Sequence, residues 1–163
     1  MVAAALDFPV HLRQALVEHA RAGDPDEVCG ILAGEGQRIT RVFPVRNTAE
    51  AVGAEQGVFR DRVTGQPSSG RKAVHYYMDP RDQLRAYNEI DATGLDLIGY
   101  YHSHTHTEAR PSPTDIRLAT DLSAIYVLVS LEDPQHPAVR AWRILKSDPL
   151  DESGSLEEIS LAP

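Results

Sequence analysis

The strongest constraint on the fold is an apolar segment that runs directly into two alternating histidines. Residues 95–101 are rich in apolar and aromatic side chains, the composition of a strand buried within a sheet. His102 and His104 follow at a spacing of two, and at the end of a strand this spacing places both imidazoles on the same face. Residues 95–102 therefore predict a buried strand that ends at a pair of histidines.

The sequence after the histidines supplies the start of a helix. Ser112 is a favourable N-cap residue, and Pro113 suits the first helical position. Asp115 then lies in the first turn of the helix that we expect over residues 113–122. Two imidazoles at a strand end would face one carboxylate at a helix start. Zinc accepts this set of ligands, and three protein ligands leave a fourth position for water, as in catalytic sites.

Each part of this pattern has a simpler explanation when it is taken alone. Loop histidines are usually solvated, and Ser-Pro-x-Asp is usually only a helix cap. The conjunction is more specific, because three of the seven histidines fall within five residues and Ser112 and Asp115 follow at fixed offsets. His106 continues the period of two and would complete a three-histidine site if the strand continued. Residues 105–111 have the composition of a loop, which favours a solvated or substrate-contacting His106.

A family resemblance rests on these residues together with a second segment. Glu27, followed by Cys29 and Gly30 in a short apolar stretch, and the two motifs around the histidines and Asp115 resemble the JAMM (MPN-plus) metalloprotease family. The resemblance covers about residues 7–145. It implies an α+β fold, with an MPN/JAMM-like mixed β-sheet flanked by helices in a single domain. Residues 101–109 and 118–130 are also similar to the actinobacterial branch that hydrolyses a cysteine adduct of a ubiquitin-like sulfur-carrier protein.

The resemblance implies a role for each of five residues. His102, His104 and Asp115 would bind Zn²⁺, while Glu27 would accept a proton from the bound water and return it to the leaving amine. Ser112 would donate a hydrogen bond to the oxyanion. Taken alone, Glu27 has the pattern of a solvated acid at a helix-to-strand junction. A Ser112 hydroxyl that is turned toward the helix amides is likewise not turned toward an oxyanion.

The implied reaction is hydrolysis of the amide bond after the C-terminal glycine of a ubiquitin-like sulfur-carrier protein, which releases cysteine from a carrier–cysteine adduct in cysteine biosynthesis. Two alternatives stay open. One is an isopeptidase that removes a ubiquitin-like modifier from lysine, which the metal motif does not distinguish. The other is a non-catalytic MPN scaffold that has lost its metal, and the intact set of five residues argues against it. The sequence is compatible with an oligomer.

Composition limits the class of protein. A chain of 163 residues suits one domain, residues 1–163. The single cysteine excludes an internal disulfide, which fits a reducing cytoplasm, and Cys29 is expected to be a buried apolar residue and not a nucleophile. We find no secretion signal, and the apolar residues 124–131 are far fewer than the ~20 that span a membrane. The net charge of −8 argues against nucleic acid as a partner.

Periodicity and turn residues predict the remaining elements. Helices are expected over residues 9–21, 80–93 and 113–122, and strands over residues 28–33, 37–45, 74–78, 95–102, 124–131 and 138–145. The first two strands form a hairpin through residues 34–36. Within the acidic C-terminal tail, residues 147–163, residues 156–161 would add an edge strand or remain loose.

Residues 47–72 are rich in glycine and form an irregular insertion loop that is longer than the corresponding region of similar proteins. Positive charge concentrates around it, because residues 37–85 hold nine basic and five acidic side chains in a chain whose net charge is negative. A solvated surface would explain this distribution. Our hypothesis is that this segment, including Arg60, Arg62, Arg71 and Lys72, docks the folded body of the carrier protein.

Overall fold

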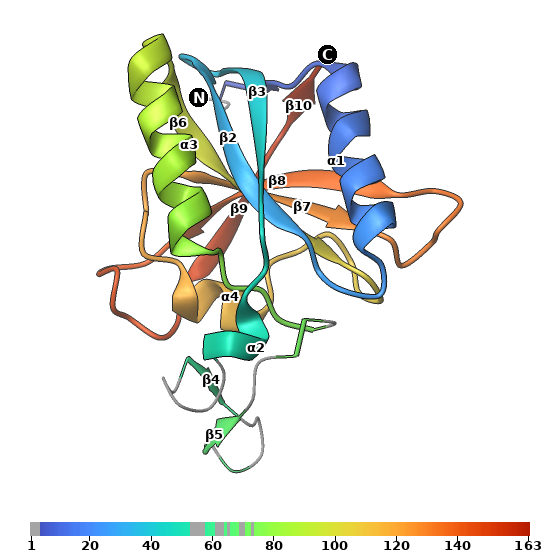
Figure 1. Ribbon diagram of the computed structural model, residues 1–163, viewed down its shortest axis with the longest axis vertical. Coiled ribbons are helices and arrows are strands. Elements are labelled where there is room, and N and C mark those ends of the chain that lie inside the picture. The colour runs from blue at the N-terminus through green and yellow to red at the C-terminus, as the bar shows by residue number, and fades with distance from the viewer. Residues whose placement is uncertain (1–3, 53–57, 61–63, 65, 69–70, 73) are drawn as a thin grey trace.

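The computed structural model describes residues 4–52, 58–60, 64, 66–68, 71–72 and 74–163. Eight strands form one sheet in the order β10-β1-β3-β2-β6-β7-β8-β9 (Figure 1). These strands are β1 (Leu6–Asp7), β2 (Cys29–Glu35), β3 (Arg38–Val45), β6 (Asp96–His104), β7 (Ile125–Ser130), β8 (Ala138–Leu145), β9 (Ser155–Ile159) and β10 (Leu161–Ala162). Parallel pairing of β6 with β7 beside antiparallel pairing of β2 with β6 makes the sheet mixed, as expected.

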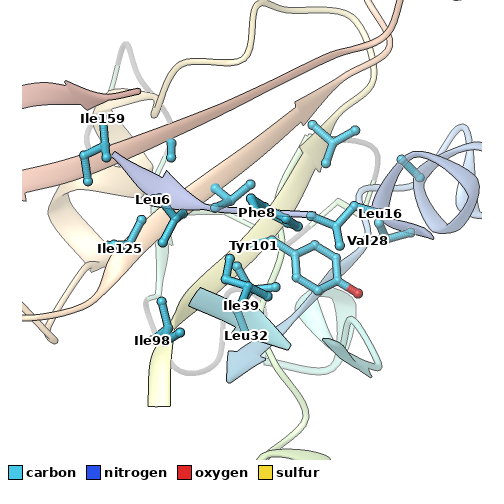
Figure 2. Close-up of a cluster of buried hydrophobic side chains, with 14 of the residues drawn as sticks. Leu6, Phe8, Leu16, Val28, Leu32, Ile39, Ile98, Tyr101, Ile125 and Ile159 are labelled. Atoms are coloured by element: carbon cyan, nitrogen blue, oxygen red, sulfur yellow. The ribbon is translucent and has the colours of Figure 1, made fainter. Parts of the chain in front are cut away.

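Each face of the sheet is covered by one long helix, α1 (Val10–Gly23) on one side and α3 (Pro80–Thr93) on the other (Figure 1). The α1 side buries Leu16, Ala20, Leu32, Ile39 and Tyr101, several of which Figure 2 shows, and the α3 side buries Ile31, Ala33, Phe43, Ala86 and Ile90. Neighbouring residues of β2 thus face opposite helices, as the period of a strand requires. Burying each large apolar side chain contributes ~1.5–3 kcal/mol, so the central strands are the most strongly held elements.

Local signals explain the elements that the sequence predicts best. The hairpin between β2 and β3 turns at Gly36, whose φ of 60° is a left-handed conformation that glycine adopts without strain. Helix α3 begins after Asp79, whose side chain accepts hydrogen bonds from the amides of Arg81 and Asp82. It ends at Gly94, with φ of 70°. The predicted bounds 80–93 are confirmed because both ends are capped locally.

The strand predicted over residues 74–78 is wrong. Met78 forms only an isolated bridge with Asn47, and residues 74–79, all of which the structure describes, contain no strand. Instead of pairing with a strand, the main chain of this segment bonds a side chain: the amide of Tyr77 donates to Asn47 Oδ1, and the carbonyl of His75 accepts from Asn47 Nδ2. An aromatic, apolar composition predicts a strand, but it does not say where the backbone hydrogen bonds go.

The helix predicted over residues 113–122 is too long. Helix α4 (Pro113–Leu118) stops because Ala119 has an extended conformation, with φ of −68° and ψ of 120°. The ammonium group of Lys146 donates hydrogen bonds to carbonyl oxygens at this end, which in a longer helix would accept from backbone amides.

The tail and the insertion contain more regular structure than expected. Strand β9 pairs with β8, and β10 pairs with β1, so the C-terminal residues close both edges of the sheet. This resolves the choice between an edge strand and a loose tail in favour of strands. The insertion, predicted to be irregular, includes helix α2 (Ala49–Val52) and the short strands β4 (Phe59–Arg60) and β5 (Pro67–Ser68). Among the described residues, we find no helix that is long and apolar enough to cross a membrane.

Candidate metal centre

Strand β6 presents the two histidines. It extends two residues beyond the predicted end, so His102 and His104 keep the alternation that places them on one face. His102 pairs with Cys29 of β2 on one side and Leu128 of β7 on the other, which fixes its main chain within the sheet. His102 is 2% exposed and His104 is 6% exposed. Burial lowers the pKa of His102, which favours the neutral imidazole that metals bind.

Helix α4 presents the carboxylate. Ser112 Oγ accepts a hydrogen bond from the amide of Asp115, and Asp115 Oδ2 accepts one of 2.8 Å from the amide of Ser112, which forms a capping box. The same Oδ2 lies 3.1 Å from Nε2 of His102 and 3.1 Å from Nε2 of His104. The two Nε2 atoms are 3.2 Å apart. Three ligand atoms therefore form a nearly equilateral triangle.

The hydrogen bonds around this triangle call for a proton or a metal cation between His104 and Asp115. His104 Nδ1 lies 2.8 Å from the carbonyl oxygen of Glu108, which can only accept, so the Nδ1 proton is donated there. A neutral His104 then directs a lone pair from Nε2 toward the Asp115 carboxylate, and two acceptors at 3.1 Å need a proton or a metal cation between them. Burial alone would raise the pKa of Asp115, but the two histidines outweigh it and hold that pKa below its ordinary value.

The donor set fits zinc. Two imidazole nitrogens and one carboxylate oxygen are a known set for catalytic zinc. Tetrahedral coordination with zinc–ligand bonds of ~2.0–2.1 Å separates neighbouring ligands by ~3.3 Å, and the three separations here are 3.1, 3.1 and 3.2 Å. The contact of His104 Nδ1 with a carbonyl is also the usual outer support of a metal-binding histidine.

Glu27 contributes a second carboxylate from the residues just before β2. One of its oxygens lies with ring nitrogens of His102 and His104 in a group whose members are all within 4.8 Å of one another. Glu27 is 6% exposed, and burial, with a smaller contribution from Asp115, raises the pKa of its carboxyl to about 8. A buried acid with a pKa near neutrality suits proton transfer. Asp115 Oδ2 lies 3.1 Å from both histidine Nε2 atoms, which suits a ligand, while the raised pKa of Glu27 suits a base.

Of the other residues considered from the sequence, Ser112 lies at the site, whereas His106 and Cys29 do not suit a role there. Ser112 lies beside the triangle, and although its oxygen accepts from the Asp115 amide, a hydroxyl keeps its own proton for donation. His106 is exposed and follows the end of β6, beyond the strand alternation that places His102 and His104 on one face. Cys29 is fully buried, and its pKa is raised to about 12, chiefly by burial, so the thiolate needed of a nucleophile is not available near neutral pH.

Two residues at the site were missed from the sequence. The ring of Tyr76 stacks on His102, with centroids 4.2 Å apart and an angle of 22° between the planes. Asn47 bonds the main-chain carbonyl of Glu27. Tyr76 gave no signal because it occurs in a segment that resembles a strand, and Asn47 resembles an ordinary loop residue at the end of β3.

Comparisons with known proteins agree with this geometry. Residues 9–145 match the family described as prokaryotic homologs of the JAB domain. The chain is 38% identical over 136 residues to a CysO-cysteine peptidase of Mycobacterium tuberculosis, a match that covers 82% of this chain and 79% of the relative. It is 31% identical over 136 residues to a desampylase of Haloferax volcanii, with 80% and 84% covered.

A solved structure supports the same conclusion for the fold. The solution structure of a Desulfitobacterium hafniense protein is similar over 96% of this chain and 90% of that chain, with a TM-score of 0.70 and 31% identity. The family match includes every residue of the candidate metal centre, since Glu27 and Asp115 both fall within residues 9–145. The chain therefore belongs to the JAB family, and it is a hydrolase of the JAMM type.

Proposed function

We propose that this protein is a zinc-dependent metallopeptidase that cleaves the amide bond after the C-terminal glycine of a ubiquitin-like sulfur-carrier protein, releasing cysteine from a carrier–cysteine adduct. The observation that carries the proposal is the triangle of His102, His104 and Asp115 atoms, with the buried Glu27 carboxylate beside it. The 38% identity to a CysO-cysteine peptidase supports the choice of substrate and a role in cysteine biosynthesis.

His102 and His104 through Nε2, and Asp115 through Oδ2, would hold the metal. Zinc bound there would supply a Lewis acid that polarises the substrate carbonyl and lowers the pKa of water toward ~7. Glu27 accepts the proton of the attacking water on its carboxylate and then delivers it to the leaving amine as the C–N bond breaks, so no proton is left over. The Ser112 hydroxyl donates its proton in a hydrogen bond to the developing oxyanion.

A second candidate is an isopeptidase that removes a ubiquitin-like modifier from lysine, and the 31% identity to a desampylase favours it. Both reactions hydrolyse an amide that follows a carrier glycine, so the same triangle and the same base serve either one. They differ only in the leaving amine, which is the α-amine of cysteine in one case and the ε-amine of lysine in the other.

The two candidates are separated by direct competition. The zinc-loaded protein is mixed with equal amounts of a carrier–cysteine adduct and a carrier joined to a lysine side chain, and the products are weighed by mass spectrometry. We expect the adduct to disappear first, to yield carrier and free cysteine, and to be spared after the metal is removed by a chelator. Faster loss of the lysine conjugate would select the isopeptidase, and intact substrates with full zinc occupancy would overturn both proposals.

We also propose that the reaction takes place in the cytoplasm. The only cysteine is free and buried, so nothing in the chain depends on an oxidising compartment. Detection of the protein mainly in a membrane or secreted fraction of its cells would contradict this location.

A further inference from the structure

The segment before α3 is held largely by the side chain of Asn47, together with Thr48, whose amide and hydroxyl both donate to the carbonyl of Tyr77. Asn47 follows the end of β3, and its Nδ2 donates hydrogen bonds to the carbonyl oxygens of Glu27 (2.9 Å) and His75 (3.0 Å). Its Oδ1 accepts hydrogen bonds from the amides of Ala49 (3.0 Å) and Tyr77 (3.1 Å). A primary amide offers two donor hydrogens and two acceptor lone pairs, so every hydrogen-bonding position of Asn47 is used.

One of these bonds acts on the main chain of the proposed base. The carbonyl of Glu27 accepts from Asn47, and its amide donates to the carbonyl oxygen of Lys72 at 2.6 Å. Glu27 precedes β2, so the ladder of the sheet does not hold both of its peptide groups. The amide side of the peptide after Glu27, that of Val28, donates to Ser103 Oγ of β6, and Asn47 holds the carbonyl side of the same peptide. The position of the Glu27 carboxylate therefore depends in part on Asn47.

The other bonds act on the ring that covers a histidine. His75 and Tyr77, both bonded to Asn47, flank Tyr76 on either side. The Tyr76 ring stacks on His102 at 4.2 Å between centroids. Fixing the peptide groups before and after Tyr76 fixes the direction of its side chain, so Asn47 also determines the cover over His102.

We infer that Asn47 is a positioning residue that sets the Glu27 carboxylate and the Tyr76 ring in register with the metal-binding triangle. The inference rests on the proposed function for its effect on turnover, but not for its effect on the metal. A misplacement of ~1 Å at a reacting group costs ~10²-fold in rate, and the loss of groups that support a metal ligand costs ~10–100-fold in affinity. An asparagine that only closes a loop would affect stability and neither of these quantities.

The test uses zinc affinity, measured by competition with a chromogenic chelator, together with kcat and KM on the carrier–cysteine adduct. Asn47→Asp keeps the shape of the side chain but replaces both donors by an acceptor that faces two carbonyls. We expect its zinc affinity to fall ~10-fold and its kcat ~10–10²-fold, with KM little changed. Tyr76→Leu should show the loss of zinc affinity, and Tyr76→Phe, which retains the stacked ring, should not. The matched control is Asn88→Asp, an exposed position on α3.

The outcomes are distinct. Wild-type zinc affinity and kcat in Asn47→Asp, with only a lowered melting temperature, would show a loop anchor and overturn the inference. If Asn47→Asp does not fold, equal zinc affinities in Tyr76→Leu and Tyr76→Phe would overturn the part that concerns the ring. The predicted pattern of zinc affinities without cleavage of the adduct would uphold the inference and reject the proposed substrate. The double variant Asn47→Asp, Tyr76→Leu should bind zinc no more weakly than Asn47→Asp alone, because the two act through one contact.

Discussion

The surroundings of two carboxylates at the same site shift their pKa values in opposite directions. Asp115 faces two imidazoles, which hold its pKa low despite burial. Glu27 is buried with weaker compensation, and its pKa is raised to about 8. This divergence supports the roles proposed above, because an acid that stays ionised suits a permanent ligand and an acid whose pKa is near neutrality suits proton transfer.

At the residue scale, the metal assignment is tested by His104→Ala. We expect this variant to lose zinc and activity but to keep its fold, because the sheet core around β2, β6 and β7 does not depend on the triangle. Metal content per chain is measured by elemental analysis, and folding by circular dichroism. His106→Ala is the control, since this exposed residue should leave zinc in place. Zinc loss in His106→Ala, with retention in His104→Ala, would require a different site.

The role of Glu27 is tested by Glu27→Gln. The amide has a similar shape and cannot accept the proton of water, so we expect kcat to fall ~10²–10⁴-fold with zinc content unchanged. Both quantities can be measured on one preparation. A carboxylate oxygen of Glu27 lies within 4.8 Å of a ring nitrogen of each histidine. A variant that loses zinc would therefore show that Glu27 is a ligand and not the base.

Ser112→Ala separates an oxyanion donor from a helix cap. Loss of an oxyanion hydrogen bond lowers kcat by ~10²–10³-fold, whereas loss of an N-cap costs ~1 kcal/mol of stability. Because the Ser112 hydroxyl accepts from the Asp115 amide and still has a proton to donate, we expect both effects. Turnover and the free energy of unfolding are measured together. Near-normal turnover in a destabilised variant would leave only the cap.

At the element scale, the weak part of the site is α4. It has six residues and none of them is fully buried, so its short length and the partial packing of Ile116 and Leu118 hold the helix that carries Asp115 only weakly. Lys146, just after β8, holds the end of this helix through hydrogen bonds to its carbonyl oxygens. Its Nζ lies 3.0 Å from the carbonyl oxygen of Ile116, 2.9 Å from that of Ala119 and 3.0 Å from that of Pro149. A cation beside the last carbonyls of a helix also interacts favourably with the helix dipole.

We therefore expect Lys146→Met to weaken zinc binding by about 3–10-fold, because the helix loses a cation worth ~0.3–1 kcal/mol and hydrogen bonds to its last carbonyls. The zinc dissociation constant is measured by chelator competition. Lys146→Arg, which keeps the charge, should recover part of the loss. Arg143→Met, a substitution on the adjoining strand β8, serves as the control. Equal affinities in both methionine variants would show that α4 holds its place without the ammonium group.

Elements with local signals were predictable, and those defined by distant contacts were not. Helix α3 has a cap at each end, and β6 carries its apolar run into the histidines, so both followed from neighbouring residues. The segment around Tyr76 failed because its hydrogen bonds go to Asn47, about thirty positions earlier in the chain. The five motif residues were found from spacing and resemblance and meet in space, while their supports, Asn47, Tyr76 and Lys146, had no motif.

At the scale of the whole molecule, both outer edges of the large sheet, β10 and β9, are formed by the C-terminal residues, while the candidate metal centre lies at the end of the inner strand β6. The insertion elements α2, β4 and β5 gather at one end of the molecule (Figure 1). The positive segment of residues 37–85 includes this insertion. We propose that this segment docks the folded body of the carrier.

The docking hypothesis is tested by reversing basic residues that form no ion pair within the described part of the chain. Arg60 already forms an ion pair of 3.0 Å with Glu152, and Arg62 lies outside the described residues, so Arg71→Glu with Lys72→Glu is the sharper change. We expect weaker association with the carrier, by an amount that shrinks as salt rises, because exposed charges are screened. Zinc content and turnover at saturating carrier should change little. Affinity is measured by calorimetry at low and high salt, with the double reversal Arg21→Glu, Arg143→Glu as a control of equal charge outside the segment. If both double variants bind equally, the effect is one of net charge, and the carrier docks elsewhere.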